Sequence, residues 1–408
     1  MKWRTIVVAV MACCLTMVAD CPAAEKTAEP SVRYLPLDAP PGRSQAVVVQ
    51  GLPLVHTRQL LPLDAEGKLV GHGSADEQIE QVLNNLEAVL GAAGSGLDKL
   101  VRLNVYALSH QTAGRVRELL TGRLDPTVRP VITAVLTPLK HRKALVAVDA
   151  VAVAAGNRQA VALEQCEAVA GETDCADAAV MPPGGVAYLS GQPEKGGLAM
   201  SAVEQSLSTL LGRLRPLKLS PAQVVQVKVF LTPVTSADAA LREVKGLFPG
   251  QLTPPVVFVE WIASAPVEIE MIAHLPLAAA KPAQPVRYYT PPGVKPSPTF
   301  SRVALVQTDR QIYISGLSAR EPGDGQSQVR DVFTQLEQIL SQTGSDLRHL
   351  AKATYYVSDD DASTMLNKLR AEFYDPKRPP AASKATVHAV GQPGRTLTID
   401  MIAVGTGR

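Results

Sequence analysis

The residues that could do chemistry lie around Lys384, near the C-terminal end of the sequence. Lys384 heads an apolar strand pattern that runs to Val390, and a second apolar pattern follows from Thr396 to Val404. Looser versions of this two-strand block occur at 130–153 and 255–276, without a lysine at the corresponding place. We therefore treat Lys384 as the candidate catalytic residue. The alternative is an exposed lysine at a strand end.

Cysteine and histidine suggest one covalent link and no metal site. Cys166 and Cys175 lie in a polar stretch apart from the N-terminal cysteines, so in an oxidising compartment we expect a disulfide that closes a small loop. The alternative is two free surface thiols. The seven histidines share no metal-ligand spacing, and phosphate-binding loops and nucleophile elbows are absent from the sequence. No metal and no cofactor are predicted.

Composition excludes a nucleic-acid partner. The 408 residues carry 40 basic and 38 acidic side chains, mixed along the chain, rather than a clustered basic face. Aromatic residues make up 4%, too few for base-stacking platforms. A chain of this length and 46% hydrophobic content is long enough for two to four globular domains.

The N-terminus is typical of a secretory signal. A basic start at 1–4 precedes an apolar run of 15 residues at 5–19, too short for a comfortable membrane span. We expect residues 1–24 to be removed, which leaves a periplasmic or secreted chain without a membrane span. Two alternatives stay open: lipidation at Cys21, which Asp20 disfavours, and an uncleaved anchor.

An internal repeat organises the rest of the chain. Segments 81–108, 205–232 and 331–358 align without gaps, so that Leu86, Leu210 and Leu336 coincide. In each, a helical stripe gives way at a glycine or proline to a β-branched strand. With an upstream hairpin, a second helix and the two closing strands, each copy is predicted to be a ββαβαββ unit of the α+β class.

The repeat sets the domain boundaries. In copy 3, for example, we expect 303–307 and 311–316 to pair as the upstream hairpin. The predicted segments are the leader 25–33, copy 1 at 34–155, copy 2 at 160–277, a Pro/Ala linker at 278–285 and copy 3 at 286–408.

The order and spacing of several short motifs resemble the RidA (YjgF or L-PSP) family. Copies 1 and 3 between them carry the fullest set of these motifs. The segments that carry the resemblance are 43–47 and 59–71 in copy 1, 190–193 and 267–273 in copy 2, and 355–359, 365–367 and 399–403 in copy 3.

The resemblance implies an assembly. Family members are homotrimers with sheets inside, helices outside and small-molecule clefts between subunits. Three copies in one chain would then form an intramolecular pseudo-trimer, because a head-to-tail ring closes on itself and covalent linkage raises the effective concentration of each copy. We expect a monomer in solution whose clefts bind a small carboxylate or carbonyl compound.

The resemblance also implies a chemistry. Active members use a cleft arginine to grip the carboxylate of an imino or enamino acid, which water hydrolyses to a keto acid and ammonia. We match its position to Val131, Val256 and Lys384, and we interpret the two valines as barrel-facing core. Only Lys384 keeps a cation there.

Further ligand-binding positions follow from the same resemblance. Asn367 matches a helix asparagine, although a solvated or capping role is the alternative. Glu268 matches an acidic residue of the closing strand and points to the same face as Glu270, where an ion pair at an inter-copy seam is the alternative. The remaining candidates are Phe300, Ser315 and Thr386.

Four arginines replace the residues typical of the family. Arg58 matches a glycine of a Ser-Gly-Gln signature, so its side chain would fill that cleft. Arg43, Arg117 and Arg242 also stand at family ligand positions. They are either surface charges or parts of a relocated anion site.

Two functions compete at this stage. The first is an exported protein that binds small carboxylate or carbonyl metabolites, with residual imine deaminase activity in the cleft of copy 3. The second is a non-catalytic scaffold with degenerate sites, favoured because no copy has the cleft arginine.

Overall fold

The computed structural model describes residues 29–156, 158–277 and 282–406. The predicted signal sequence and part of the predicted linker (278–281) lie outside the described residues. Within these ranges, no helix combines the length and apolar character that crossing a membrane requires.

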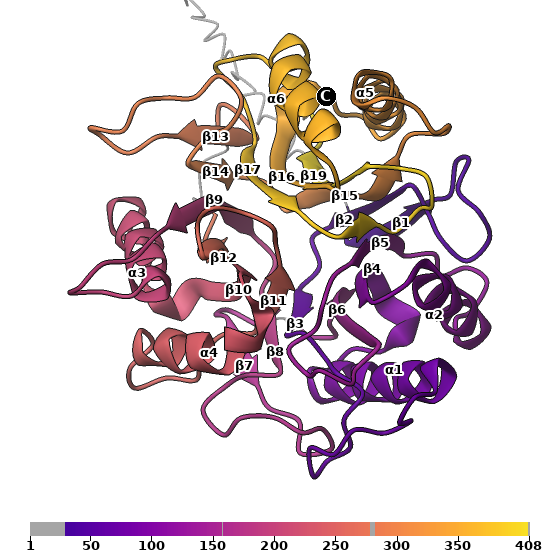
Figure 1. The fold of residues 1–408 in the computed structure, drawn as a ribbon. Coiled ribbons are helices and arrows are strands. Elements are labelled where there is room, and N and C mark those ends of the chain that lie inside the picture. The colour runs from indigo at the N-terminus through magenta and orange to yellow at the C-terminus, as the bar shows by residue number, and fades with distance from the viewer. Residues whose placement is uncertain (1–28, 157, 278–281, 407–408) are drawn as a thin grey trace, which may run out of the picture.

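Three mixed sheets form the inside of the molecule, with helices around them (Figure 1). The first sheet has the order β18 (Ala389–Val390), β5 (Val131–Leu136), β4 (Leu100–Ala107), β6 (Val146–Val153), β3 (Leu54–Thr57), β8 (Ala178–Met181), β7 (Ala162–Glu164). The second has the order β11 (Val256–Glu260), β10 (Val224–Leu231), β12 (Val267–Leu275), β9 (Gly185–Glu194), β14 (Val303–Val306), β13 (Val286–Tyr289). The third has the order β1 (Ser31–Leu35), β2 (Ala46–Gln50), β15 (Arg310–Ser318), β19 (Leu397–Val404), β16 (Leu350–Val357), β17 (Ala381–Thr386).

A pair of helices packs on each sheet, as the apolar stripes predicted. In copy 1, Leu83, Leu86 and Leu90 are fully buried against the strands. Side chains cap the first helices, since Ser74 accepts a hydrogen bond from the backbone N–H of Glu77. The pairs are α1 (Ala75–Ala92) with α2 (His110–Arg123), α3 (Ala202–Leu214) with α4 (Ala237–Gly246), and α5 (Gly325–Gln342) with α6 (Asp360–Phe373).

The strands of the copies are exchanged around a ring, which corrects the predicted hairpins. In copy 3, β14 pairs with β9 of copy 2 instead of with β15. Likewise β8 of copy 2 pairs with β3 of copy 1, and β2 of copy 1 pairs with β15 of copy 3. Each sheet edge is filled by the equivalent strand of the next copy. The alternation of apolar and polar residues in the sequence is therefore compatible with pairing inside one copy and with pairing between copies.

The leader and the closing block also differ from expectation. β1 takes in Ser31 to Arg33, which we predicted to be leader, because these residues pair with β2. The two closing strands β17 and β19 lie on opposite sides of β16 and do not pair with each other. The central strand β16 therefore ties the closing block together.

Apolar side chains from all three copies meet along the inside of the ring. One shared cluster contains Val101, Val225 and Ala351, at equivalent places on β4, β10 and β16. Farther along the same strands, Tyr106, Phe230 and Tyr356 belong to a second shared cluster. These two clusters join the copies, whereas each helix pair has a separate core with its own sheet.

A buried polar layer lies between the two shared clusters. The side chain of Arg102 in copy 1 reaches Asp400 of copy 3 at 3.3 Å, and both side chains are 2% exposed. Lys352 of copy 3 reaches Glu270 of copy 2 at 2.9 Å. The third position holds Gln226 of copy 2, which donates to the Thr57 carbonyl of copy 1 at 2.8 Å. Each copy thus contacts the preceding one in the ring.

Removing one partner of this layer should destabilise the fold strongly. In Asp400→Ala, Arg102 stays buried without its carboxylate, so we expect a loss of about 3–5 kcal/mol in the free energy of unfolding. The measurement is a urea unfolding curve of each protein. Asp76→Ala is the control, since the Asp76 side chain is 57% exposed and solvent screens its ion pair with Arg115, so we expect a much smaller loss. Equal losses in the two variants would contradict the prediction.

Candidate functional site

Three boundaries between copies lie where a bulged strand of one copy faces a closing strand of the next. The resemblance predicted clefts at these boundaries, so we call each one a cleft, and a pocket is present at two of them. In copies 2 and 3 the bulges contain Ser190–Gly191 and Ser315–Gly316, between the register shifts of β9 and β15. We name the clefts by the copies that meet: cleft 1/2 faces β11, cleft 2/3 faces β17 and cleft 3/1 faces β5. Gly316 has φ +63, and a side chain there would collide with the Ile132 carbonyl across cleft 3/1.

In copy 1, the residues at the bulge are shifted by one position from their predicted alignment with the Ser-Gly-Gln signature. The N–H of Arg58 donates to the Asp177 carbonyl as that of Ser190 donates to the Arg302 carbonyl, so Arg58 stands at the serine position. Gln59 therefore stands at the glycine position, which corrects the match of Arg58 to a glycine. The sequence alignment matches Gln59 to the glutamine of the Ser-Gly-Gln signature, which places this segment one residue out of register.

The register of the closing strands also corrects which residues of copies 1 and 2 are equivalent to Lys384. Lys384 lies opposite Tyr355, whereas Val131 lies opposite Arg102 and Val256 opposite Val227. The register equivalents of Lys384, read from the same ladders, are Ala134 and Phe258. Val131 is core of the shared cluster as predicted, but Val256 faces the helix-side core of copy 2.

In cleft 2/3, Glu268 lies against the bulge of copy 2 and the closing strand of copy 3. An added Cβ on Gly191 would come within 1.9 Å of Glu268 Oε1 and 2.8 Å of Ser383 Oγ, so the three residues are in close contact. Burial, reinforced by the nearby charge of Glu270, raises the pKa of Glu268 to about 8. Glu268 is therefore a carboxylic acid that can donate a proton near neutral pH.

Glu270, two residues farther along β12, has a pKa shift in the opposite direction. Burial opposes its ionisation, but Lys352 and Lys228 together hold its pKa below the usual value. Ser383 Oγ donates to Glu270 Oε2 at 2.6 Å. The alternative of an inter-copy ion pair is thus confirmed for Glu270, and Glu268 is left as the neutral member.

Lys384 faces the helix side of β17. Its Nζ donates to Ser363 Oγ of α6 at 2.8 Å. Burial and the nearby charge of Arg370 lower the pKa of Lys384, while Glu268 opposes that shift. Lys384 is therefore a partly buried amine beside cleft 2/3, and α6 holds its side chain.

The other predicted ligand residues do not form one site. Asn367 is exposed on α6, and Thr386 is partly buried on the side of β17 that also carries Lys384. Phe300 lies under the guanidinium of Arg302 at 4.9 Å. Ser315 is buried in cleft 3/1, where its hydroxyl bonds to that of Thr133. Of the six predicted residues, the structure thus brings Glu268 and Lys384 near each other. Phe300 is adjacent in sequence to Ser301, whose carbonyl accepts a hydrogen bond from the Ser190 hydroxyl in the bulge of copy 2.

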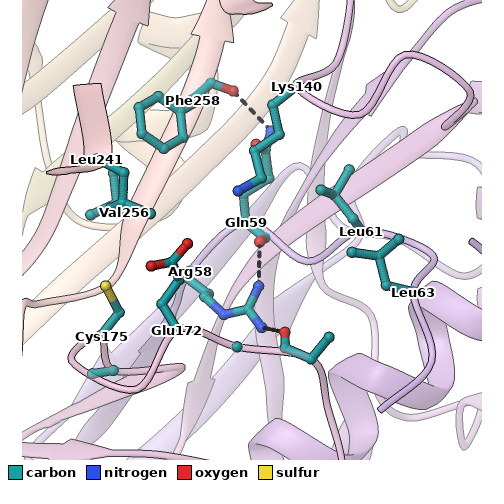
Figure 2. Close-up of a pocket in the computed structure, with 13 residues that line it drawn as sticks. Arg58, Gln59, Leu61, Leu63, Lys140, Glu172, Cys175, Leu241, Val256 and Phe258 are labelled. Carbon is teal, nitrogen blue, oxygen red and sulfur yellow. Dashed lines mark hydrogen bonds between the residues drawn. The ribbon is translucent and has the colours of Figure 1, made fainter. Parts of the chain in front are cut away.

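Cleft 1/2 contains an apolar pocket of about 180 Å³. Figure 2 shows Cys175, Leu241, Val256 and Phe258 on one side and Leu61 and Leu63 on the other. Gln59 lies between them, and its Nε2 donates to the Phe258 carbonyl at 2.9 Å. The residue that replaces a glycine thus closes part of this cleft.

The charged side chains that line this pocket have partners. Arg58 Nε lies 2.5 Å from Asp177 Oδ1. Figure 2 shows the hydrogen bond that Arg58 NH1 donates to the Gln59 carbonyl. Lys140 pairs with Asp238 at 3.3 Å, and Glu172 pairs with Lys245 at 3.2 Å. The pocket therefore offers apolar surface and neutralised charges.

The predicted disulfide between Cys166 and Cys175 is wrong, because both residues are free thiols. Cys166 packs against the helix-side core of copy 1, whereas Cys175 belongs to the corresponding core of copy 2. The exchange of β7 and β8 into the first sheet places the two thiols in different cores. Burial raises the pKa of the Cys175 thiol.

Cleft 3/1 adjoins a larger cavity of about 720 Å³, which Ile132 also lines. Arg43, just before β2, and Arg117 of α2 line it, with Ile132 of β5 and Gln392 of copy 3. Both arginines are partly buried, and within the described ranges neither has an ion-pair partner. Burial lowers the pKa of each guanidinium, and the charge of Arg117 adds to the effect on Arg43.

Two of the four arginines singled out in the sequence therefore meet in one cavity. Arg58 is bound to Asp177, and Arg242 is exposed on α4. In the part of the chain that the structure describes, no group of three or more His, Cys, Asp or Glu could hold a metal ion. In the described part of the chain, Arg43 and Arg117 are thus two cations without an ion-pair partner that line one cavity.

A sequence model of the family described as endoribonuclease L-PSP matches residues 39–154 and 293–405, which correspond to copies 1 and 3. Copy 2 repeats their order of helices and central strands in the structure. The match covers more than half of the chain.

Shorter proteins are similar to parts of the chain. A goat protein named 2-iminobutanoate/2-iminopropanoate deaminase is 30% identical over 112 residues, which are 26% of this chain and 79% of the relative. A RutC family protein from Synechocystis is 30% identical over 111 residues, 27% of this chain and 84% of that protein. The solved structure of a putative endoribonuclease from Thermotoga maritima is 32% identical, with 30% of this chain and 98% of that chain covered at a TM-score of 0.23.

Glu268 should make stability depend on pH. Because its pKa is about 8 in the fold and about 4.5 ordinarily, the folded chain binds more protons than the unfolded chain between these values. Raising the pH through this window should weaken the fold by up to about 1.4 kcal/mol per pH unit through this group. We therefore expect the unfolding midpoint of wild type to fall more steeply with rising pH than that of Glu268→Gln, when both are measured from pH 5 to about 8. The prediction would be contradicted if Glu268→Gln kept the pH dependence of wild type. It would also be contradicted if Glu321→Gln, a change at an exposed glutamate, reduced the pH dependence equally.

Proposed function

Since the chain belongs to the endoribonuclease L-PSP family, which includes RidA-like proteins, we propose that it binds small carboxylate or carbonyl metabolites in its inter-copy clefts. Cleft 3/1 is the principal site. One observation carries this choice: Arg43 and Arg117 line a cavity of about 720 Å³ without an ion-pair partner among the described residues. A guanidinium that is partly removed from water gains from a carboxylate ligand, which its planar fork can hold through both oxygens.

The surroundings of the two arginines suit a small ligand. Ile132 adds an apolar contact, and Gln392 adds an amide from the neighbouring copy. A site of this size lies within the range of small-molecule pockets. A ligand would contact copies 1 and 3 together, so binding requires the assembled ring.

The assembly proposed for the chain is an intramolecular pseudo-trimer that is monomeric in solution. The exchange of β2, β8 and β14 between copies supports this, because each sheet is completed by a strand of the same chain. A ring that closes in this way leaves the sheet edges at β3, β9 and β15 occupied.

Export is the proposed location. The basic start and the apolar run of the first 19 residues support a signal sequence, and an oxidising compartment would hold the chain after its removal. N-terminal sequencing of the protein purified from its source cells tests this, and an intact Met1 would contradict it.

A second candidate function is weak imine or enamine hydrolysis in cleft 2/3. Glu268, with its raised pKa, would protonate the imine nitrogen as water adds to the imine carbon, and Lys384 would attract the substrate carboxylate. The resulting carbinolamine would then collapse to the keto acid and release ammonia, with the proton of its hydroxyl group going to the departing nitrogen. The goat relative is named for a deaminase activity on imino acids, which supports this chemistry by similarity. If neither cleft binds a ligand, a scaffold with degenerate sites remains.

Ligand binding is tested by calorimetry with pyruvate, a small compound with both a carboxylate and a carbonyl. We expect wild type to bind one pyruvate tightly enough to measure, and Arg43→Gln and Arg117→Gln to raise Kd by about tenfold or more, through loss of a charge-assisted hydrogen bond.

Arg242→Gln is the matched control, since Arg242 is exposed at the corresponding place on α4. Light scattering on the same samples should give the mass of one chain. Undetectable binding, or equal weakening in all three variants, would count against cleft 3/1, and a threefold mass would count against the pseudo-trimer.

Hydrolysis is tested by supplying 2-iminobutanoate generated by an amino-acid oxidase and following keto-acid release. We expect a slow acceleration by wild type that Glu268→Gln reduces by roughly a hundredfold, the scale of general acid catalysis. Lys384→Arg should increase the rate, because arginine orients a carboxylate better than lysine. No acceleration by wild type or by Lys384→Arg would rule out the hydrolase.

A further inference from the structure

The charges that line the cavity of cleft 3/1 indicate which ligand charge would suit it. Two guanidiniums line the cavity, and the acidic residue beside them is Glu118. Glu118 is already engaged, because its carboxylate lies 2.9 Å from Arg115 and its side chain is 68% exposed. The charge of Glu118 acts on Arg117, but neither Arg43 nor Arg117 has an ion-pair partner within the described ranges, so the cavity keeps an excess of positive charge.

These two charges also repel each other. The charge of Arg117 acts on Arg43 together with burial, and both lower the pKa of Arg43. A ligand with one negative charge would leave one guanidinium uncompensated in a partly desolvated place. A ligand with two negative charges would neutralise both, and each anionic group would gain a charge-assisted hydrogen bond.

The backbone segments that carry the two arginines are held in place before a ligand arrives. Gly42 has φ +78 and packs so closely on α2 that an added Cβ would overlap the side chain of Thr121. This contact fixes the segment that carries Arg43 against the helix that carries Arg117. Pro40 and Pro41, which also line the cavity, restrict the same segment further. Such preorganisation lowers the entropic cost of binding.

We propose that cleft 3/1 selects small organic dianions, with dicarboxylates as the class that fits best, one carboxylate to each arginine. This inference rests on the proposed carboxylate-binding function and narrows its ligand. Ile132 and the proline side chains offer apolar contact to the carbon chain between the two charges, which inorganic phosphate lacks. Gln392 of copy 3 adds an amide at the inter-copy side of the cavity.

The experiment compares succinate with butanoate, its four-carbon monocarboxylate counterpart, by calorimetry on the full chain at low ionic strength. We expect succinate to bind wild type roughly tenfold or more tightly, since the second charge-assisted hydrogen bond is worth about that factor. In Arg43→Gln and in Arg117→Gln, succinate affinity should fall to about the level of butanoate. Arg242→Gln should keep the wild-type preference.

The outcomes separate the two proposals. If both acids bind with equal affinity, the dianion inference fails and the carboxylate site stands. If neither binds, both proposals fall. If inorganic phosphate binds as tightly as succinate, charge alone governs the site and the dicarboxylate assignment is wrong. Thermal unfolding of each variant checks that the fold is intact, so that a loss of preference reports on the cavity.

Discussion

The buried charge layer between the two shared apolar clusters is the constraint on which the ring depends. Arg102 meets Asp400, and Lys352 meets Glu270, each time across a boundary between copies. Charges removed from water are tolerated only with a partner in good geometry. The copies must therefore occupy fixed positions around the ring, and the apolar clusters on either side pack only when the charges are matched.

Covalent fusion allows this layer to be asymmetric. The place of Arg102 in copy 1 is taken by Gln226 in copy 2 and by Lys352 in copy 3, and the facing acids differ in length as well. Three identical chains would have to repeat one pair three times. In a single chain each boundary has its own pair, so the order of the copies around the ring is encoded in different side chains.

The same freedom explains why the clefts have diverged. Cleft 1/2 is apolar, with its charges neutralised and Gln59 inside. Cleft 2/3 contains Glu268, whose pKa is raised, and cleft 3/1 contains Arg43 and Arg117. Local replacements at equivalent positions have thus produced three chemical environments on one framework. Function on such a framework is decided by the individual site, not by the fold.

The sequence by itself determined the elements and the family, because apolar periodicity and repeated spacing are local. The helices, the central strands and candidates such as Glu268 could be identified in this way, and so could Arg43 and Arg117 as two of four arginine replacements. Only the tertiary structure decided which strands pair, since an exchanged strand has the same alternation as a hairpin strand. It also decided that Arg58 is bound to Asp177, that Cys166 and Cys175 lie in different cores, and that Arg43 and Arg117 share a cavity. These facts depend on contacts between residues far apart in the chain, which no local pattern encodes.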